Sequence, residues 1–148
     1  MKSVLLVCMS LVVLIASAPA ADNLKLNPKL DYSSDSQDGP LITGDNMDAG
    51  FTAGKPAYVI IYGEGCFNSK RQSRRTVDLY EKYKGRVQFV VIDLDHPLSA
   101  QQEGLRKKYY KGYIPHVVVL SAAGAPLYNS SGEVDSGVIS KLLDQAVR

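Results

Sequence analysis

The sequence has 148 residues, enough for one domain and too few for two of ordinary size. Hydrophobic residues make up 45% and charged residues 22%, which excludes a disordered chain, a collagen-like chain and a membrane protein with several spans. The 17 lysines and arginines against 15 acidic residues give a net charge of +2, too small to favour binding of nucleic acid or anionic lipid.

Residues 1–20 have the pattern of a secretory signal peptide. A positively charged start precedes an apolar run over residues 4–15, and Ala18 and Ala20 are the small residues that signal peptidases accept. The run is shorter than the roughly 20 residues that span a bilayer as a helix. We therefore predict cleavage after Ala20, export to the periplasm or secretion, and no stable membrane insertion of the mature chain. The alternative is an uncleaved membrane anchor.

The two cysteines, Cys8 and Cys66, cannot form a disulfide framework, and no Cys/His cluster has the spacing of a zinc site. Signal cleavage would remove Cys8 and leave Cys66 as the single cysteine of a protein in a compartment where thiols tend to be oxidised. Such a thiol is buried and inert, bonded to another molecule, or chemically active. We predict no metal site and no bound cofactor.

Residues 21–56 are predicted to form an N-terminal extension or linker, with a first strand and a short helix as candidates within it. The segment 33–40 is rich in Ser, Asp, Gly and Pro, which are typical of loops. Met47 and Phe51 lie four residues apart, the spacing of an apolar stripe on a short helix. The compact domain is predicted to cover residues 57–148.

Regular patterning begins at Ala57. Continuous apolar runs with β-branched and aromatic residues predict buried strands, and apolar stripes at helical spacing predict amphipathic helices. In chain order we expect a strand at 57–62, a helix over about 67–84, a strand at 87–93, a helix over about 99–110, a strand at 117–120, a short strand around 127–128 and a helix over about 135–147. Alternating strands and helices predict parallel pairing through crossovers, and the adjacent last two strands predict an antiparallel hairpin.

The motif Cys-Phe-Asn-Ser at residues 66–69 directly follows the first buried strand and opens the first helix. The first turn of a helix has unpaired N–H groups and a partial positive charge, which favour a thiolate over a thiol. Ser69 can donate a hydroxyl hydrogen bond to the Cys66 sulfur. The basic run 70–75 adds positive charge, although most of it is expected to point into solvent, and Glu64 opposes it. We expect a partly exposed sulfur with a lowered pKa.

From about Tyr58 to the C-terminus the arrangement resembles the thioredoxin superfamily. The resemblance is carried by the buried strand leading into Cys66, the strand ending at Ile-Asp-Leu-Asp (92–95), and Gly-Tyr-Ile-Pro (112–115) before the third buried strand. It implies an α/β, thioredoxin-like fold with a central mixed sheet flanked by helices. It also implies that Pro115 is cis and faces the active cysteine, and that Pro115 and the Ile114 backbone hold an extended substrate strand.

The motif departs from the CxxC of that family, because Ser69 stands where the resolving cysteine would be. Ile60 stands at the position of the buried acid that helps to deprotonate that cysteine, and Gly65 replaces the usual aromatic residue. A CxxS site can form a mixed disulfide but cannot release itself through an internal thiol. Dithiol cycling is therefore not expected, whereas glutathione-dependent chemistry, isomerisation and retention of client thiols are compatible with the motif.

We therefore predict an exported monomer that performs thiol–disulfide exchange in the manner of an oxidoreductase or isomerase. Cys66 would be the nucleophile, Ser69 would stabilise its thiolate, and Ile114 and Pro115 would bind the substrate. The expected partners are protein thiols or disulfides, or small thiols such as glutathione as co-substrate, and no nucleic acid. His116 is a candidate auxiliary base, and the alternative is a histidine packed at the start of a strand. The competing function is a non-catalytic module that binds peptides in the same groove.

Overall fold

The computed structural model describes residues 22–27 and 42–148. The predicted signal peptide at 1–20 and the predicted loop at 33–40 lie outside these residues. The elements are β1 (Leu24–Leu26), β2 (Ile42–Gly44), β3 (Ala57–Tyr62), α1 (Phe67–Tyr83), β4 (Gln88–Asp93), α2 (Ala100–Tyr109), β5 (His116–Leu120), β6 (Pro126–Ser131) and α3 (Ser136–Ala146). In these described segments, no helix has both the length and the apolar character needed to cross a membrane.

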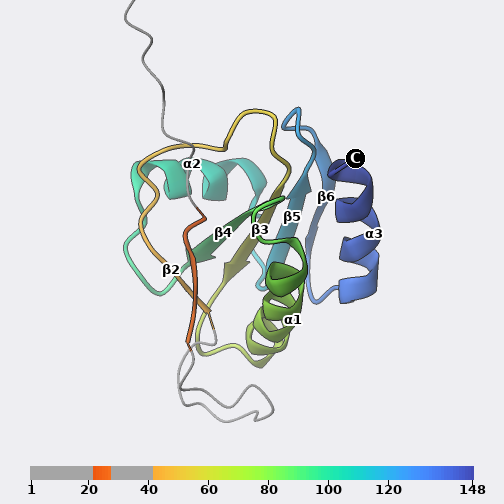
Figure 1. Cartoon of the computed structure of the whole chain (residues 1–148). Helices are drawn as coiled ribbons and strands as arrows, with labels where there is room; N and C mark the ends of the chain where they lie inside the picture. Colours follow the sequence, from red (N-terminus) through yellow and green to blue (C-terminus); the bar gives the residue numbers. More distant parts are fainter. Residues whose placement is uncertain (1–21, 28–41) are drawn as a thin grey trace, which may run out of the picture.

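Every strand and helix that the sequence predicts from residue 57 onward is present, with small differences at the ends and a longer β6. The central sheet has the strand order β4-β3-β5-β6 (Figure 1). Parallel pairing is confirmed for β3 with β4, and the antiparallel hairpin is confirmed for β5 with β6.

The expectation of parallel pairing was wrong for β5, which runs antiparallel to β3. The connection through α2 leaves the sheet after Asp93, which lies opposite Tyr62 at the end of β3. It returns at His116, which lies opposite Ile61 at that same edge of the sheet. Because the chain leaves and returns at one edge, β5 has to run in the opposite direction. The sheet is therefore mixed, as the resemblance implies.

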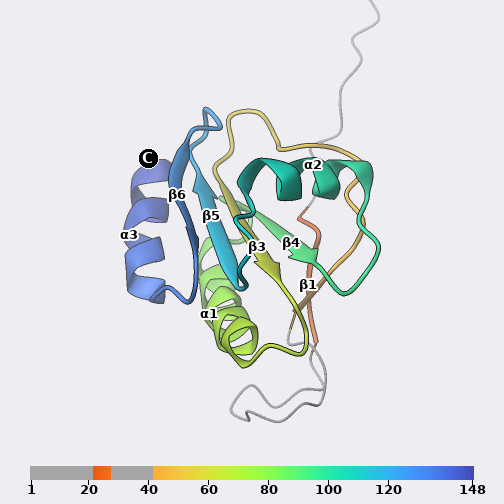
Figure 2. The ribbon, with the colours of Figure 1, turned by 180° about the vertical axis from the view of Figure 1, so that it is seen from behind.

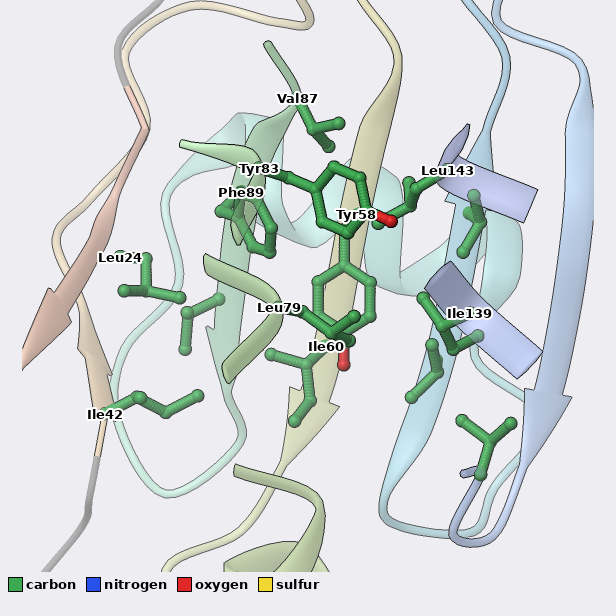
Figure 3. Packing of buried hydrophobic residues seen from close by; sticks show 14 of the residues in the cluster. Leu24, Ile42, Tyr58, Ile60, Leu79, Tyr83, Val87, Phe89, Ile139 and Leu143 are labelled. Carbon is green, nitrogen blue, oxygen red and sulfur yellow. The ribbon is translucent and has the colours of Figure 1, made fainter. Parts of the chain in front are cut away.

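Helices cover both faces of the sheet: α1 and α3 lie on one face and α2 on the other (Figures 1 and 2). On the first face, Ile60 of β3 packs in a cluster with Leu79 of α1 and Ile139 of α3 (Figure 3). On the second face, Ile61 belongs to a cluster with Tyr109 of α2. Both faces of β3 are buried, which explains why its sequence is a continuous apolar run and does not alternate.

Strands β1 and β2 form an antiparallel ribbon beside β4. The side chain of Asn23, which directly precedes β1, joins this ribbon to β4. Its Oδ1 accepts a hydrogen bond from the Val91 N–H at 2.7 Å, and its Nδ2 donates to the Val91 carbonyl at 2.9 Å. Leu24 and Ile42 are buried in the cluster under α1 and α3 (Figure 3). The described part of the N-terminal segment thus contains the expected first strand and is packed into the core of the sheet.

The short helix expected around Met47 and Phe51 is absent, since the chain has no helical turn there. The Asp45 carbonyl, which would start such a helix, accepts hydrogen bonds from the side chains of Asn23 and Gln102. Met47 is nevertheless buried, in the cluster beneath α2. The apolar spacing therefore reflected burial in the core and not helix formation.

Candidate functional site

Cys66 lies where β3 gives way to α1, at the N-cap position of the helix. The turn that leads to it is closed by a hydrogen bond from the Cys66 N–H to the Gly63 carbonyl at 3.3 Å. The cysteine is free and partly exposed. This is the position that the sequence predicts for it.

Partial burial acts to raise the pKa of the Cys66 thiol, but neighbouring donors outweigh this effect and the pKa lies below its usual value. The backbone N–H and the hydroxyl of Ser69, the backbone N–H of Asn68 and the charge of Arg71 all favour the thiolate. Ser69 is fully buried, and its Oγ also accepts a hydrogen bond from the Gly63 N–H at 3.5 Å. Ser69 thus links the end of β3 to the sulfur.

Ile114 and Pro115 lie beside the turn that carries Cys66. The Ile114–Pro115 peptide bond is cis, and the Pro115 carbonyl accepts a hydrogen bond from the Gly132 N–H at 2.8 Å. Ile114 Cδ1 would lie 2.8 Å from a Cβ placed on Gly63, so the two segments are in direct contact and glycine makes room for the isoleucine. The structure therefore brings the predicted substrate-binding pair to the same edge of the sheet as the predicted nucleophile.

His116 is not brought to Cys66. It lies opposite Ile61, so its ring is on the α2 face of the sheet, whereas Cys66 opens the helix on the other face. Its Nδ1 is 2.8 Å from Ser131 Oγ, and its Nε2 is 2.6 Å from Asn129 Oδ1. Burial lowers the pKa of His116. The arrangement is that of a histidine packed at the start of a strand.

A charged cluster that was not predicted from the sequence lies where β3 and β4 end. Nδ1 of His96 lies 2.8 Å from Asp93 Oδ2 and 3.6 Å from Glu64 Oε1, and the Asp95 carboxylate accepts a hydrogen bond from the Glu64 N–H at 2.6 Å. Burial and the charge of Asp93 raise the pKa of Glu64, and the hydrogen bond that the His96 ring donates to the Asp93 carboxylate raises the pKa of His96. Because β3 and β4 are parallel neighbours, their carboxyl ends lie side by side. Charged residues directly after two predicted parallel strands could therefore have indicated this cluster.

Three side chains of this cluster have the chemistry of metal ligands. The ligand atoms of Glu64, Asp93 and His96 all lie within 4.8 Å of one another. Imidazole nitrogen and carboxylate oxygen are ligands for zinc and other divalent transition metals. Among the described residues, these form the one group of three such side chains close enough to share an ion, and the absence of a metal site stays a prediction.

The basic run on α1 is not wholly solvated. Arg71 and Arg75 both contact the carboxylate of Glu133, at 2.6 Å and 2.9 Å. The hydrogen bond from Arg71, together with both positive charges, lowers the pKa of Glu133. Arg74 is exposed, as expected for this run. The partner was not predicted, because Glu133 is brought to α1 only by the folded hairpin of β5 and β6.

Comparisons with known proteins identify the fold. No family model and no curated protein match the sequence. Thioredoxin-2 of the malaria parasite, described as a component of protein secretion machinery, is 20% identical over 62% of this chain and 82% of that one, with a TM-score of 0.52. Fasciola hepatica thioredoxin is 18% identical over 64% and 83% of the two chains, and chloroplastic thioredoxin z is 22% identical over 62% and 78%, each with a TM-score of 0.50. The chain has the fold of the thioredoxin superfamily.

Proposed function

We propose that the protein performs thiol–disulfide exchange through Cys66. One observation carries the proposal: a partly exposed sulfur at the start of α1, with a lowered pKa, lies on the turn that contacts the Ile114–Pro115 segment. A lowered pKa increases the fraction of thiolate at neutral pH, and the thiolate is the nucleophile in exchange. The same turn and segment form a ready substrate-binding edge on the thioredoxin fold.

In the proposed reaction the Cys66 thiolate attacks one sulfur of a substrate disulfide. A sulfur–sulfur bond forms between Cys66 and that sulfur, the substrate bond breaks, and the second substrate sulfur leaves as a thiolate that takes a proton from solvent. The electron pair of the thiolate becomes the new bond, and the pair of the broken bond leaves with the second substrate sulfur, so that sulfur is reduced to a thiol while Cys66 is oxidised into the mixed disulfide. Ser69 stabilises the starting thiolate but has no sulfur with which to break the mixed disulfide.

Release of the mixed disulfide therefore requires an external thiol, and we propose a low-molecular-weight thiol such as glutathione or a second protein thiol. No buried acid is needed for this route, which agrees with Ile60, apolar and fully buried, at the position that the resemblance gives to that acid. Isomerisation of client disulfides and retention of client thiols are the forms of this chemistry that suit a single cysteine.

Two exposed aromatic side chains flank the site. Phe67, next to Cys66, is 54% exposed, and Tyr113, next to Ile114, is 76% exposed. Exposed aromatic surface beside a reactive group is typical of a binding edge for protein segments. We propose that extended client peptides lie across Ile114 and Pro115 between these two rings, with the protein acting as a monomer.

We also propose that the mature protein is exported. The support is the signal-peptide pattern of residues 1–20 and the single cysteine that cleavage would leave. The N-terminal sequence of the protein recovered from the periplasm or medium should begin at Ala21 or within one or two residues of it. A chain that still begins at Met1 in exported material would contradict the proposal.

Disulfide reduction tests the chemistry in three proteins: the wild type, Cys66→Ala and Ser69→Cys. With glutathione as the external thiol, the wild type should form a trappable mixed disulfide with a peptide disulfide, and Cys66→Ala should form none. Ser69→Cys should shorten the life of that intermediate, because residues 66 and 69 lie one helical turn apart.

If the wild type and Cys66→Ala are equally inert toward disulfides and Ser69→Cys gains nothing, exchange is refuted. Binding of the same peptide by all three proteins would then point to the non-catalytic module.

A further inference from the structure

Residues 132–134, directly after β6, connect the Ile114–Pro115 segment to helix α1, whose N-cap is Cys66. The Gly132 N–H donates to the Pro115 carbonyl at 2.8 Å, and the Val134 N–H donates to Gln72 Oε1 on α1 at 2.9 Å. Glu133 lies between them and is therefore fixed at both sides by the backbone. Its side chain is only 21% exposed, and its carboxylate contacts Arg71 and Arg75 of α1.

The carboxylate of Glu133 binds the Arg71 guanidinium in a fork. Arg71 Nε lies 3.1 Å from each carboxylate oxygen, and Arg71 Nη2 lies 2.6 Å from Oε1. The same Nη2 donates to Asn68 Oδ1 at 2.6 Å. Asn68 in turn offers its backbone N–H to the Cys66 sulfur. A continuous series of contacts thus runs from Glu133 through Arg71 and Asn68 to Cys66.

We infer that Glu133 is a positioning residue for the proposed exchange reaction: it holds the Arg71 guanidinium beside Asn68 and offsets part of its positive charge at the Cys66 sulfur. Arg75 contacts the other carboxylate oxygen at 2.9 Å, so one negative charge serves two positive ones. The positive charge left over favours the thiolate, and the carboxylate limits by how much. This inference rests on the proposed function of Cys66.

Glu133→Gln removes the negative charge of this side chain and keeps nearly its size and shape. The amide keeps an acceptor for Arg71 but carries no negative charge, so the thiolate should become more favoured. Arg71→Gln removes the positive charge and should act in the opposite direction. Each side chain is partly solvated, so we expect alkylation of Cys66 by iodoacetamide at about pH 6.5 to change by about twofold to fivefold, faster in Glu133→Gln and slower in Arg71→Gln.

Two control variants separate this effect from a general change of charge or shape. Arg74→Gln removes an exposed charge of α1 that Glu133 does not contact, and it should leave the pH profile of alkylation unchanged. Glu133→Asp keeps the charge and should restore most of the wild-type profile. Glu64, the acidic residue two positions before Cys66, is the same in every variant. Thermal unfolding of each variant establishes that the comparison is made on folded protein.

The double variant Arg71→Gln/Glu133→Gln decides the route. If Glu133 acts through Arg71, the faster alkylation caused by Glu133→Gln should largely disappear when Arg71 is absent. The inference is overturned if Glu133→Gln slows alkylation or leaves it unchanged, or if its full effect persists without Arg71. Because alkylation reads only the thiol, a normal series with no disulfide exchange would refute the proposed function and leave the coupling of Glu133 to Cys66 standing.

Discussion

Ser69→Ala removes the one hydroxyl that contacts both the Cys66 sulfur and the end of β3. A hydrogen bond to a charged group contributes about 1.5–3 kcal/mol. We use about 1 kcal/mol here, because the sulfur is partly exposed and the Ser69 backbone N–H, the stronger of the two Ser69 donors, remains. The thiolate should be disfavoured by that amount, which corresponds to about a fivefold slower alkylation of Cys66 below its pKa.

The assay is the pH profile of iodoacetamide alkylation, followed by mass spectrometry of the Cys66 peptide. Ser73→Ala is the matched control: Ser73 is also buried and lies one helical turn further along α1, but it does not contact the sulfur. It should destabilise the fold without moving the profile. If Ser69→Ala leaves the profile unchanged, or if Ser73→Ala moves it equally, the hydroxyl does not stabilise the thiolate and the reasoning fails.

Two further predictions concern the edge of the sheet and the buried histidine. Asn23→Ala leaves the Val91 N–H without its partner and the Val91 carbonyl with only the longer hydrogen bond from Gln102, and it should lower the free energy of unfolding by about 2 kcal/mol in chemical denaturation. Lys25→Ala removes only an exposed ion pair and should lower it by less than about 1 kcal/mol, so equal losses would contradict the role of Asn23. Because burial lowers the pKa of His116, the unfolded chain is protonated there first, and the contribution of His116 to stability should fall as the pH drops below 6.5. His116→Gln should flatten that dependence in denaturation curves, and an unchanged slope would refute it.

The sequence predicts those parts of the fold that depend on local patterns. The elements after residue 57 follow from apolar runs and helical stripes, which report directly which side chains are buried. The direction of β5 does not follow from them, because it depends on the edge at which the α2 connection returns. Met47 shows a second limit, since its side chain is buried by a loop whose backbone is held by Asn23 and Gln102. Apolar spacing reports burial there and not the local backbone.

The candidate site divides in the same way. Cys66 and Ser69 are one helical turn apart, so their contact follows from the sequence once the helix is located. The sequence left His116 open as a base beside Cys66, and the structure places it on the α2 face because it lies opposite Ile61. Glu133, by contrast, reaches α1 only through the hairpin of β5 and β6, and no local pattern predicts that contact.

In the proposed exchange reaction, the surroundings of Cys66 favour attack by its thiolate but provide no group that breaks the resulting mixed disulfide. Ser69 and the start of α1 stabilise the thiolate that attacks, yet the fully buried hydroxyl of Ser69 cannot break the bond that results. Ile60, apolar and fully buried in the core of the sheet, offers no carboxylate that would activate a resolving group. The lifetime of a mixed disulfide must then depend on how readily an external thiol reaches the sulfur past Phe67 and Tyr113. In the proposed reaction, such a site retains its partner for as long as the surrounding thiol supply is low.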